Sequence, residues 1–361
     1  MRVLIAMSGG VDSSAAAALT LDAGGECVGV TMKLVANREN AAAAGRSCCS
    51  YQDINDARAA AWKLGIPHYV LNYTEAFTRH VIEPFVESYE RGETPNPCIE
   101  CNRRLKFSLL LHRAGELEAA RIVTGHYARI EPPRGPGRRW LLKKGRDPRK
   151  DQSYVLYMLS QEELARVSFP LGGLTKGEVR DIAESRGLAN ARKEESQDIC
   201  FVPGGDYGDF MEAYRGKSYP PGDILDREGR VLGRHRGLVR YTLGQRRGLG
   251  VAGGVPLYVA AKDPAENTLT LGEERDLYSR SLDAGGVNLI AAEALPSPVR
   301  LGVKTRYLQK EQWARVEQTG PAAVHLEFEE PQRAVTPGQA AVFYDGETLV
   351  GGGTIESVRG S

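Results

Sequence analysis

The sequence predicts an α/β domain built on a doubly wound parallel sheet, followed by a small β-rich central domain and a C-terminal β-barrel. In the first 200 residues, short apolar runs alternate with helix-like stretches, which is the pattern of strand–helix–strand units. The second half holds 24 of the 41 glycines, and its strand-like runs are short. A chain of 361 residues is long enough for two or three domains, and we place them at residues 1–205, 206–281 and 282–361.

The elements of the first domain follow one another as strands and helices. An Ala-rich helix is predicted from about Ser13 to Asp22, and Asp53 is the predicted N-cap of a second helix that ends at Gly65. Capping boxes at Ser160-x-x-Glu163 and Thr175-x-x-Glu178 predict two later helices. Parallel strands place the active site at their carboxyl ends. Apolar runs predict these strands at Val3–Met7, Cys27–Met32, Tyr69–Leu71 and Arg121–Thr124.

The second half is predicted to consist of strands and turns. Asp223–Leu232 and Leu238–Tyr241 are predicted to form hairpin strands around the turn residues Arg227-Glu228-Gly229. Further strands, close together in the sequence, predict a small barrel at Val299–Tyr307, Trp313–Glu317, Val324–Phe328, Ala340–Tyr344 and Leu349–Ile355.

The composition excludes a disordered chain and a membrane protein. Hydrophobic residues make up 42% of the chain and charged residues 26%, an ordinary globular balance. No apolar run approaches the roughly 18 residues that a membrane span needs. The apolar start at Val3–Met7 is too short for a signal-peptide core, so we expect a cytoplasmic protein. The net charge is only +1, so a surface for nucleic acid must be a local basic patch.

A glycine-rich loop between the first strand and the first helix is predicted to bind ATP. Its glycines let the backbone approach an anion, and the helix N-terminus supplies N–H donors. No lysine follows the glycines, so the loop fits pyrophosphate as the leaving group, and Asp12 is predicted to act through Mg²⁺. The alternative is an ordinary helix cap after a glycine turn. The predicted ATP-binding residues are Ala6, Met7, Ser8, Gly9, Gly10, Val11, Asp12 and Ser13, with Met32 and Gly125 at the ends of strands.

Three of the six cysteines are candidates for chemistry. In a long cytoplasmic chain, cysteines indicate metal or redox chemistry more than a disulfide framework. The candidates are Cys98 and Cys101, in a C-x-x-C motif, and Cys200 about 100 residues later. Cys27 lies in an apolar strand and is predicted to be core, and the Cys48-Cys49 pair is interpreted as packing in a loop.

The loop sequence S-G-G-V-D-S resembles the pyrophosphatase loop of the ATP-pyrophosphatase families. Further motifs resemble those of the bacterial tRNA-specific 2-thiouridylases, in the same order and over essentially the whole chain. The resemblance implies an adenine nucleotide α-hydrolase-like fold and ATP-dependent 2-thiolation of the wobble uridine of tRNA. Adenylation of the C2 oxygen would precede its replacement by sulfur. These motifs are Thr94–Asn102, Thr124–Tyr127, Lys150–Tyr154, Glu195–Phe201, Tyr241–Arg246, Lys304–Tyr307 and Pro337–Gln339.

The resemblance also implies roles for the cysteines. Cys200 would carry a persulfide, loaded by a cysteine desulfurase or a sulfur-carrier protein, and Cys101 would release the sulfur or form a disulfide with Cys200. Both would need thiolate character, for which Arg103, Arg104 and Lys106 are nearby cations. Well-known members have Asp where this chain has Cys98. The three thiols Cys98, Cys101 and Cys200 would suit a [4Fe-4S] cluster with one open iron. A metal-free persulfide relay and a zinc site are the alternatives.

A tRNA surface is predicted from the resemblance and from two basic stretches. Residues 134–150 hold eight Lys or Arg, and residues 227–247 hold seven arginines, which suits phosphate binding. The other functions that the loop allows are a different ATP-pyrophosphatase ligase acting on tRNA, or a tRNA-binding or sulfur-carrier protein without catalysis. The residues predicted to contact tRNA are Asn96, Pro97, Cys98, His126, Lys150, Asp151, Gln152, Arg306, Tyr307 and Gln339.

Overall fold

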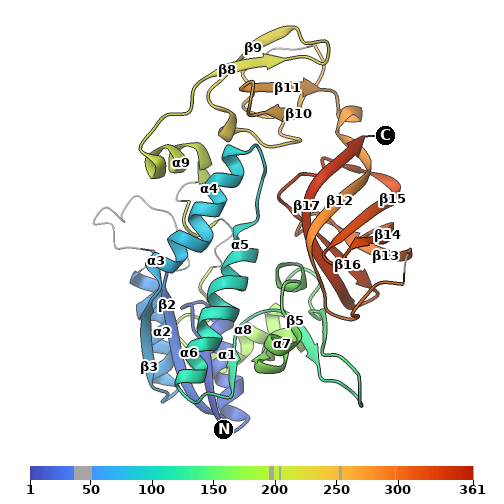
Figure 1. Cartoon of the computed structure of the whole chain (residues 1–361). Helices are drawn as coiled ribbons and strands as arrows, with labels where there is room; N and C mark the ends of the chain where they lie inside the picture. The colour runs from blue at the N-terminus through green and yellow to red at the C-terminus, as the bar shows by residue number, and fades with distance from the viewer. Residues whose placement is uncertain (36–50, 195–198, 203–204, 252–253, 297, 361) are drawn as a thin grey trace.

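The computed structural model describes residues 1–35, 51–194, 199–202, 205–251, 254–296 and 298–360. Figure 1 shows three parts: a sheet flanked by helices at the N-terminal end, a small sheet formed by β8–β11, and a barrel that contains β12–β17. The α/β class, the strand-rich central part and the C-terminal barrel are confirmed. In the part of the chain that is described, no helix is long and apolar enough to cross a membrane.

The first part is a five-stranded parallel sheet in the order β3-β2-β1-β4-β7. Along β1, Val3 and Ile5 join one hydrophobic cluster while Leu4 joins another, because successive side chains of a strand point to opposite faces. Each face is therefore covered by helices. The strands are β1 (Arg2–Ala6), β2 (Glu26–Lys33), β3 (His68–Asn72), β4 (Arg121–Val123) and β7 (Val167–Ser168).

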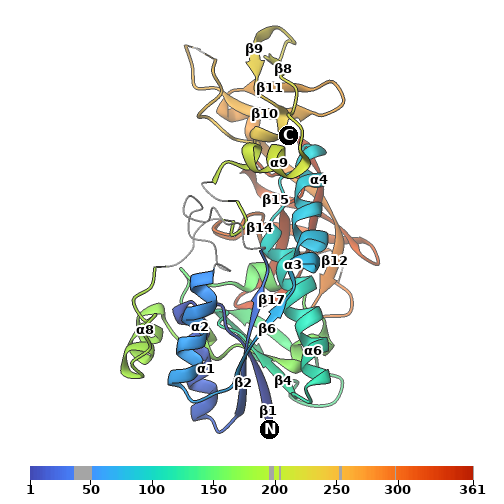
Figure 2. The same cartoon turned by 90° about the vertical axis from the view of Figure 1, so that its left-hand side faces the viewer.

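Helices α1 (Val11–Asp22), α2 (Tyr51–Lys63) and α8 (Lys176–Ser185) pack on one face of this sheet. Helix α6 (Leu110–Glu116) packs on the other, and Figure 2 shows it across the sheet from α1 and α2. The two predicted capping boxes are confirmed, at the start of α7 (Gln161–Arg166) and of α8. The prediction of Asp53 as an N-cap is wrong, since α2 begins at Tyr51 and Asp53 lies in its first turn.

A helical arm connects β3 to β4. It runs through α3 (Thr74–Phe77), a π-helical segment (Thr78–Ile82) and α4 (Glu83–Glu90). After a turn it returns through α5 (Pro97–Glu100), a second π-helical segment (Cys101–Leu109) and α6. Helix α9 (Tyr207–Arg215) packs against the far end of this arm, where Phe85, Phe201 and Met211 share a hydrophobic cluster.

The central part is a four-stranded sheet in the order β10-β11-β8-β9. The predicted turn around Arg227-Glu228-Gly229 is confirmed and divides Asp223–Leu232 between β8 and β9, because Asp226 accepts hydrogen bonds from the N–H groups of Glu228 and Arg230. The predicted strand Leu238–Tyr241 is wrong, since Leu238–Arg240 is a short 3-10 helix. The strands are β8 (Gly222–Leu225), β9 (Val231–His235), β10 (Tyr258–Asp263) and β11 (Thr268–Gly272).

The C-terminal part is a closed six-stranded barrel in the order β12-β15-β14-β13-β16-β17, because β17 pairs back to β12. Its five predicted strands are confirmed, with the first ending earlier, at Lys304, and β12 is an addition. The strands are β12 (Tyr278–Leu289), β13 (Val299–Lys304), β14 (Gln312–Gly320), β15 (Ala323–Arg333), β16 (Ala340–Asp345) and β17 (Thr348–Gly360).

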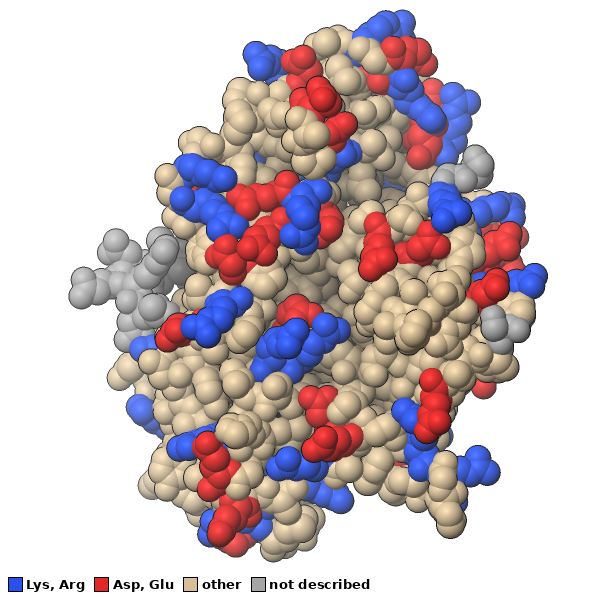
Figure 3. Space-filling view, viewed as in Figure 1, with Lys and Arg blue, Asp and Glu red and all other residues tan. Residues whose placement is uncertain are grey.

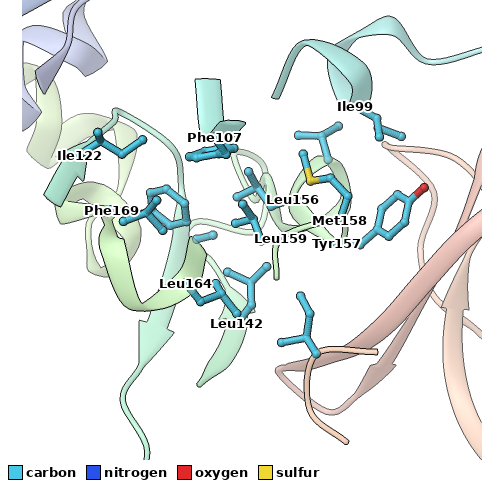
Figure 4. Close-up of a cluster of buried hydrophobic side chains, with 14 of the residues drawn as sticks. Ile99, Phe107, Ile122, Leu142, Leu156, Tyr157, Met158, Leu159, Leu164 and Phe169 are labelled. Atoms are coloured by element: carbon cyan, nitrogen blue, oxygen red, sulfur yellow. The ribbon is translucent and has the colours of Figure 1, made fainter. Parts of the chain in front are cut away.

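The barrel and the first part of the chain share one hydrophobic core. A hairpin of β5 (Ala128–Glu131) and β6 (Leu141–Lys144) pairs with β17, so the first part of the chain extends the sheet of the barrel. Val342 and Leu349 of the barrel lie in the same cluster as Leu4 of β1. In Figure 4, Ile99 and Tyr157 lie on the barrel side of this cluster, and Phe107 and Phe169 lie toward the other side.

Candidate active site

The loop after β1 is shaped by glycine and serine. Gly9 has φ +77°, and a Cβ on it would lie 2.1 Å from the Asp53 carbonyl oxygen, so only glycine fits there. The Ser8 N–H donates to Ser13 Oγ at 3.1 Å, and Ser13 Oγ donates to the Gly10 carbonyl at 3.0 Å. No side chain caps α1 at Gly10. The first N–H groups of α1 therefore face outward, which is the arrangement that binds phosphate at helix N-termini.

The other residues predicted to bind ATP surround this loop. Gly125 follows β4 and touches the loop, since a Cβ on it would lie 2.8 Å from both the Asp12 carbonyl carbon and the Ser13 nitrogen. Met7 is buried, and its N–H donates to the Val30 carbonyl at 2.8 Å. Met32, at the end of β2, is partly buried and packs against two hydrophobic clusters. The structure thus brings the first and the fourth strand of the chain together at the loop.

A lysine from a distant part of the chain reaches the loop. Lys176 Nζ donates to Asp12 Oδ1 at 2.7 Å, and the Tyr127 hydroxyl donates to the same oxygen at 2.7 Å. Lys176 is the first residue of α8, and its N–H donates to Asp147 at 3.1 Å. Sequence reasoning missed both Lys176 and Tyr127. The capping box at Thr175 was a signal, because it puts Lys176 at a helix start in a sheet whose helix starts face the ligand.

Asp12 fits a role toward Mg²⁺. This ion is usually bound through one or two carboxylates together with substrate phosphates and water. Asp12 would supply one such carboxylate, sharing it with the Lys176 ammonium.

Of the predicted tRNA contacts Lys150, Asp151 and Gln152, Gln152 bonds directly to Tyr127. Gln152 Oε1 accepts from the Tyr127 N–H at 3.0 Å, and the Gln152 N–H donates to the Tyr127 carbonyl at 2.9 Å. The buried Asp151 carboxylate accepts from the Gly145 N–H at 3.0 Å and from the Ser153 hydroxyl at 2.9 Å. Lys150 is half-buried beside them. This segment therefore orients the tyrosine that contacts Asp12.

The chain that leads toward Cys200 is anchored to the same loop. Asn190 donates to the Gly9 carbonyl at 3.0 Å and to Ser14 Oγ at 2.9 Å. Lys193 Nζ donates to Asp53 at 2.6 Å and to Asp56 at 2.5 Å. Residues Glu195 to Asp198 of the predicted motif lie outside the described residues, as do Cys48 and Cys49.

Cys101 and Cys200 lie at the same hydrophobic cluster. Both are half-buried and pack against a group that includes Phe77, Leu105 and Phe201. Cys98 is exposed on α5, and its N–H donates to the side chain of Asn96, the N-cap of that helix, at 3.1 Å. Pro97 is buried between them. Cys98 thus differs from Cys101 and Cys200 in its greater exposure.

The three cysteines are not gathered into a metal-binding group within the described part of the chain. Across the residues described, no three His, Cys, Asp or Glu side chains gather into a group that could hold a metal ion. A [4Fe-4S] cluster on three protein ligands needs Cys98, Cys101 and Cys200 to converge. The arrangement supports thiol chemistry between two cysteines more than cluster binding by three.

His126 and Gln339, which the sequence predicts to contact tRNA, make contacts within the protein. His126 is buried, its Nδ1 lies 2.6 Å from Thr124 Oγ1, and burial together with the nearby Lys106 charge holds its pKa well below the usual range. Its ring centroid lies 5.6 Å from that of Phe107. Gln339 donates to the Thr94 carbonyl at 2.5 Å.

Arg306 and Tyr307, at the end of β13, are partly buried. Arg306 donates to the Ala334 carbonyl, and burial lowers the pKa of its guanidinium. The Tyr307 ring meets the Tyr154 ring edge-on at 6.0 Å between centroids. Both side chains keep some exposure, so this corner of the barrel remains accessible.

Most charges of the two basic stretches are neutralised by acids of the same protein. Lys143 pairs with Glu131 at 2.8 Å and Lys144 with Glu311 at 2.5 Å, and Arg139 donates to the Ile290 carbonyl at 2.8 Å. Figure 3 shows basic and acidic side chains interspersed over one face of the molecule. Arg246 and Arg247 are exposed and have no ion pair with any described residue, and the same holds for Arg134, Arg138 and Arg236.

The chain matches three family models in succession. They are described as the tRNA methyl transferase HUP domain over residues 1–204, the tRNA methyl transferase PRC-barrel domain over 208–273, and the aminomethyltransferase β-barrel domain over 279–355. Among solved structures, a 4-thiouridine synthetase bound to RNA and ATP is similar at a TM-score of 0.37 and 18% identity, over 56% of this chain and 44% of that one. An NMN synthetase from Francisella tularensis is similar at 0.33 and 17%, over 61% and 78% of the two chains.

Curated relatives are similar over nearly their full length. The tRNA-specific 2-thiouridylase MnmA of Moorella thermoacetica is 51% identical, over 98% of this chain and 99% of that protein. The MnmA proteins of Symbiobacterium thermophilum and Pelotomaculum thermopropionicum are each 48% identical. These alignments cover 98% and 99% of this chain, and 92% and 97% of the two relatives. The resemblance seen in the sequence is confirmed, and the chain belongs to the family of tRNA-specific 2-thiouridylases.

Proposed function

We propose that this protein is a tRNA-uridine 2-sulfurtransferase that spends ATP to replace the C2 oxygen of the wobble uridine with sulfur. The observation that carries the proposal is the combination of an open phosphate loop next to Lys176 with two half-buried thiols, Cys101 and Cys200, on one cluster in the same part of the chain. Membership in the thiouridylase family supports tRNA as the substrate.

In the adenylation step, the uridine C2 oxygen attacks the α-phosphate of ATP. The new O–P bond forms as the bond to the pyrophosphate breaks, and the uracil N3 proton is lost to solvent. The N–H groups at the start of α1 and the Lys176 ammonium stabilise the negative charge that gathers on the leaving pyrophosphate. Mg²⁺, when bound, would neutralise phosphate charge from the Asp12 side. Tyr127 orients the Asp12 carboxylate.

In the sulfur step, the terminal sulfur of a Cys200 persulfide attacks C2, and AMP leaves. The uridine is then joined through its new sulfur to Cys200. The Cys101 thiolate attacks Cys200 Sγ and forms a Cys101–Cys200 disulfide, and the electron pair of the broken S–S bond stays on the sulfur bound to C2. A cellular dithiol must then reduce the disulfide before the next turnover.

The proposed reaction needs two partners, a protein that donates sulfur and the tRNA substrate. A cysteine desulfurase or a sulfur-carrier protein would load Cys200, since the thiol itself brings no sulfane sulfur. The tRNA phosphates would meet Arg246 and Arg247, and the residues around Tyr307 would meet the anticodon. We propose domains at 1–205, 206–281 and 282–361; the last boundary falls within β12.

The experiment is a reconstituted reaction with unmodified tRNA, ATP and a persulfide donor, using protein freed of iron by chelation. Pyrophosphate release and 2-thiouridine in digested tRNA are measured. Cys101→Ala and Cys200→Ala are expected to release pyrophosphate but to form no 2-thiouridine through several turnovers. Cys98→Ala, at the exposed cysteine, is expected to keep at least half of the thiolation rate.

Three other outcomes would contradict the proposed mechanism or function. Thiolation that needs iron, and that is lost in Cys98→Ala, would mean that the three cysteines converge on a cluster and that the two-thiol relay is wrong. Turnover that survives loss of both Cys101 and Cys200 would indicate a ligase using another nucleophile. Absence of tRNA-dependent pyrophosphate release would indicate a binding or carrier protein.

A further inference from the structure

A loop of the barrel is bonded to the segment that precedes the Cys98–Cys101 helix. The Gln339 side-chain amide donates to the Thr94 carbonyl at 2.5 Å, and the Thr94 N–H donates to the Pro337 carbonyl at 3.0 Å. A Cβ on Gly338 would lie 3.0 Å from Glu93 Cβ, so the barrel loop and the segment around Glu93 are in close contact. Thr94 is two residues before Asn96, which caps α5. The barrel is thus bonded to the segment that leads into the helix with Cys98 and Cys101.

The same barrel loop has little freedom of its own. The Gly338 N–H donates to the Ile355 carbonyl at 2.9 Å, and the Ile355 N–H donates to the Gln339 carbonyl at 2.8 Å. Ile355 is in β17, the strand that closes the barrel. The loop is therefore bonded to β17 and also to Thr94. A shift of the barrel would move the segment around Thr94 with it.

A second contact with the barrel lies just after Cys101. The Tyr157 side chain interacts with Arg103 and with Thr354 of β17. Its ring lies against the backbone of β17, since a Cβ on Gly352 would be 2.8 Å from it. Asn102 also donates to the Val155 carbonyl at 3.0 Å. Cys101 therefore lies in the sequence between two residues with contacts toward the barrel: Thr94 with the loop Pro337–Gln339, and Arg103 through Tyr157, which contacts β17.

We propose that Gln339 is a positioning residue for sulfur transfer: it fixes the start of the Cys98–Cys101 helix on the barrel and so sets the approach of Cys101 to Cys200. The inference rests on the proposed sulfur-transfer function. A displacement of about 1 Å between reacting groups can cost two orders of magnitude in rate. Gln339 acts through the Thr94 carbonyl, so this role differs from the direct tRNA contact predicted for it from the sequence.

The test compares Gln339→Met and Gln339→Glu with a control, Gln312→Glu. Met keeps the length of the side chain without a donor, and Glu places an acceptor against the Thr94 carbonyl. Gln312 is also a barrel glutamine, but its amide bonds to the nearby Lys310 carbonyl. Four quantities are measured on the full chain: tRNA affinity, tRNA-dependent pyrophosphate release, single-turnover sulfur transfer at saturating tRNA from persulfide-loaded protein, and diamide-driven formation of the Cys101–Cys200 disulfide without tRNA.

Both Gln339 variants are expected to slow sulfur transfer and disulfide formation at least tenfold. Pyrophosphate release and tRNA affinity should stay within twofold of the wild type, which also shows that the variants are folded, and Gln312→Glu should match the wild type throughout. Weaker tRNA binding with normal transfer at saturating tRNA would overturn the proposal and make Gln339 a tRNA contact. Unchanged disulfide formation would also overturn it. If the wild type forms no 2-thiouridine, the proposed function fails, while the disulfide rates still decide whether Gln339 positions Cys101.

Discussion

At the scale of single residues, the catalytic part is organised by a few buried polar contacts between distant positions. Asp12 accepts hydrogen bonds from Lys176 and Tyr127, and Tyr127 is held by Gln152. Each link fixes the next, so a carboxylate in the loop is oriented by residues more than 100 positions away. Charged hydrogen bonds of this kind are among the stronger ones in proteins.

Lys176→Met is expected to lower the rate of tRNA-dependent pyrophosphate release about 100-fold, because removal of one charge-stabilising donor costs a reaction about that much. Asp12→Ala should abolish the same step. Both variants should bind tRNA with unchanged affinity. Lys217→Met is the control, since Lys217 pairs with Glu90 away from the loop. Full pyrophosphate release by Lys176→Met would show that this lysine supports only the fold.

His126 is expected to make the protein less stable in acid. Burial holds its folded-state pKa well below its unfolded value of about 6.5, so below that pH the unfolded chain binds a proton that the folded chain does not. The stabilisation is complete above pH 6.5 and falls as the pH drops, by up to about 1.4 kcal/mol per unit. Urea midpoints at pH 7.5 and 5.5 should therefore differ more in the wild type than in His126→Asn. Equal differences would mean that His126 is protonated in the folded state.

At the scale of elements, glycines let the loop after β1 and the turn after β4 touch. A side chain at Gly9 would collide with the Asp53 backbone, and one at Gly125 with the backbone of Asp12 and Ser13. Both collisions are with main-chain atoms, which cannot rotate away as a side-chain end can. The phosphate loop is therefore shaped by its neighbours as well as by its own sequence.

Gly125→Ala is expected to lower adenylation at least tenfold, because the new methyl group lies 2.8 Å from two backbone atoms of the loop and must displace them. The midpoint of thermal unfolding should fall by only a few degrees, as for a loss of about 1 kcal/mol. Gly254→Ala, where a Cβ meets nothing within 4 Å, should leave both quantities unchanged. Normal pyrophosphate release by Gly125→Ala would show that the loop shifts without cost.

At the scale of the whole molecule, charge pairing distinguishes the basic residues that are engaged within the protein from those that we propose to contact RNA. The arginines of the central part are largely engaged: Arg227 pairs with Asp276, and Arg230 pairs with Asp226. Arg246 and Arg247 follow on the same part of the chain and are exposed without such a partner among the described residues. Residues of this kind gain most from a phosphate, because no internal ion pair has to be broken.

Replacing Arg246 and Arg247 together by alanine is expected to weaken tRNA binding and to flatten its dependence on salt. Each lost phosphate contact lowers the slope of log affinity against log salt by about 0.7 to 0.9. Replacing Arg227 and Arg230 by alanine is the matched control, and its slope should equal that of the wild type. Binding measured between 50 and 200 mM salt, a range in which such losses are large, checks both. A slope unchanged in the first variant would move the RNA surface elsewhere.

The sequence by itself determined much of the local structure and the family, and it named the candidate reacting groups. Apolar runs located four of the five parallel strands, and the two-residue strand β7 was missed. The motifs located the phosphate loop and Cys101 with Cys200. The prediction failed where local patterns allow several structures: the apolar residues at Leu238 form a short 3-10 helix, and strand β12, which contains Gly285 and Gly286, lacks a clear apolar run.

Only the tertiary structure decided which of these residues meet. It brought Lys176 to Asp12, tied Gln339 to Thr94, buried His126 beside Phe107, and left Cys98 more exposed than Cys101 and Cys200. It also paired Lys143 with Glu131 and Lys144 with Glu311. These contacts join positions far apart in the chain. The free energy of each contact depends on the distance between the groups and on their burial in the folded protein. Neither quantity can be derived from the neighbouring residues in the sequence.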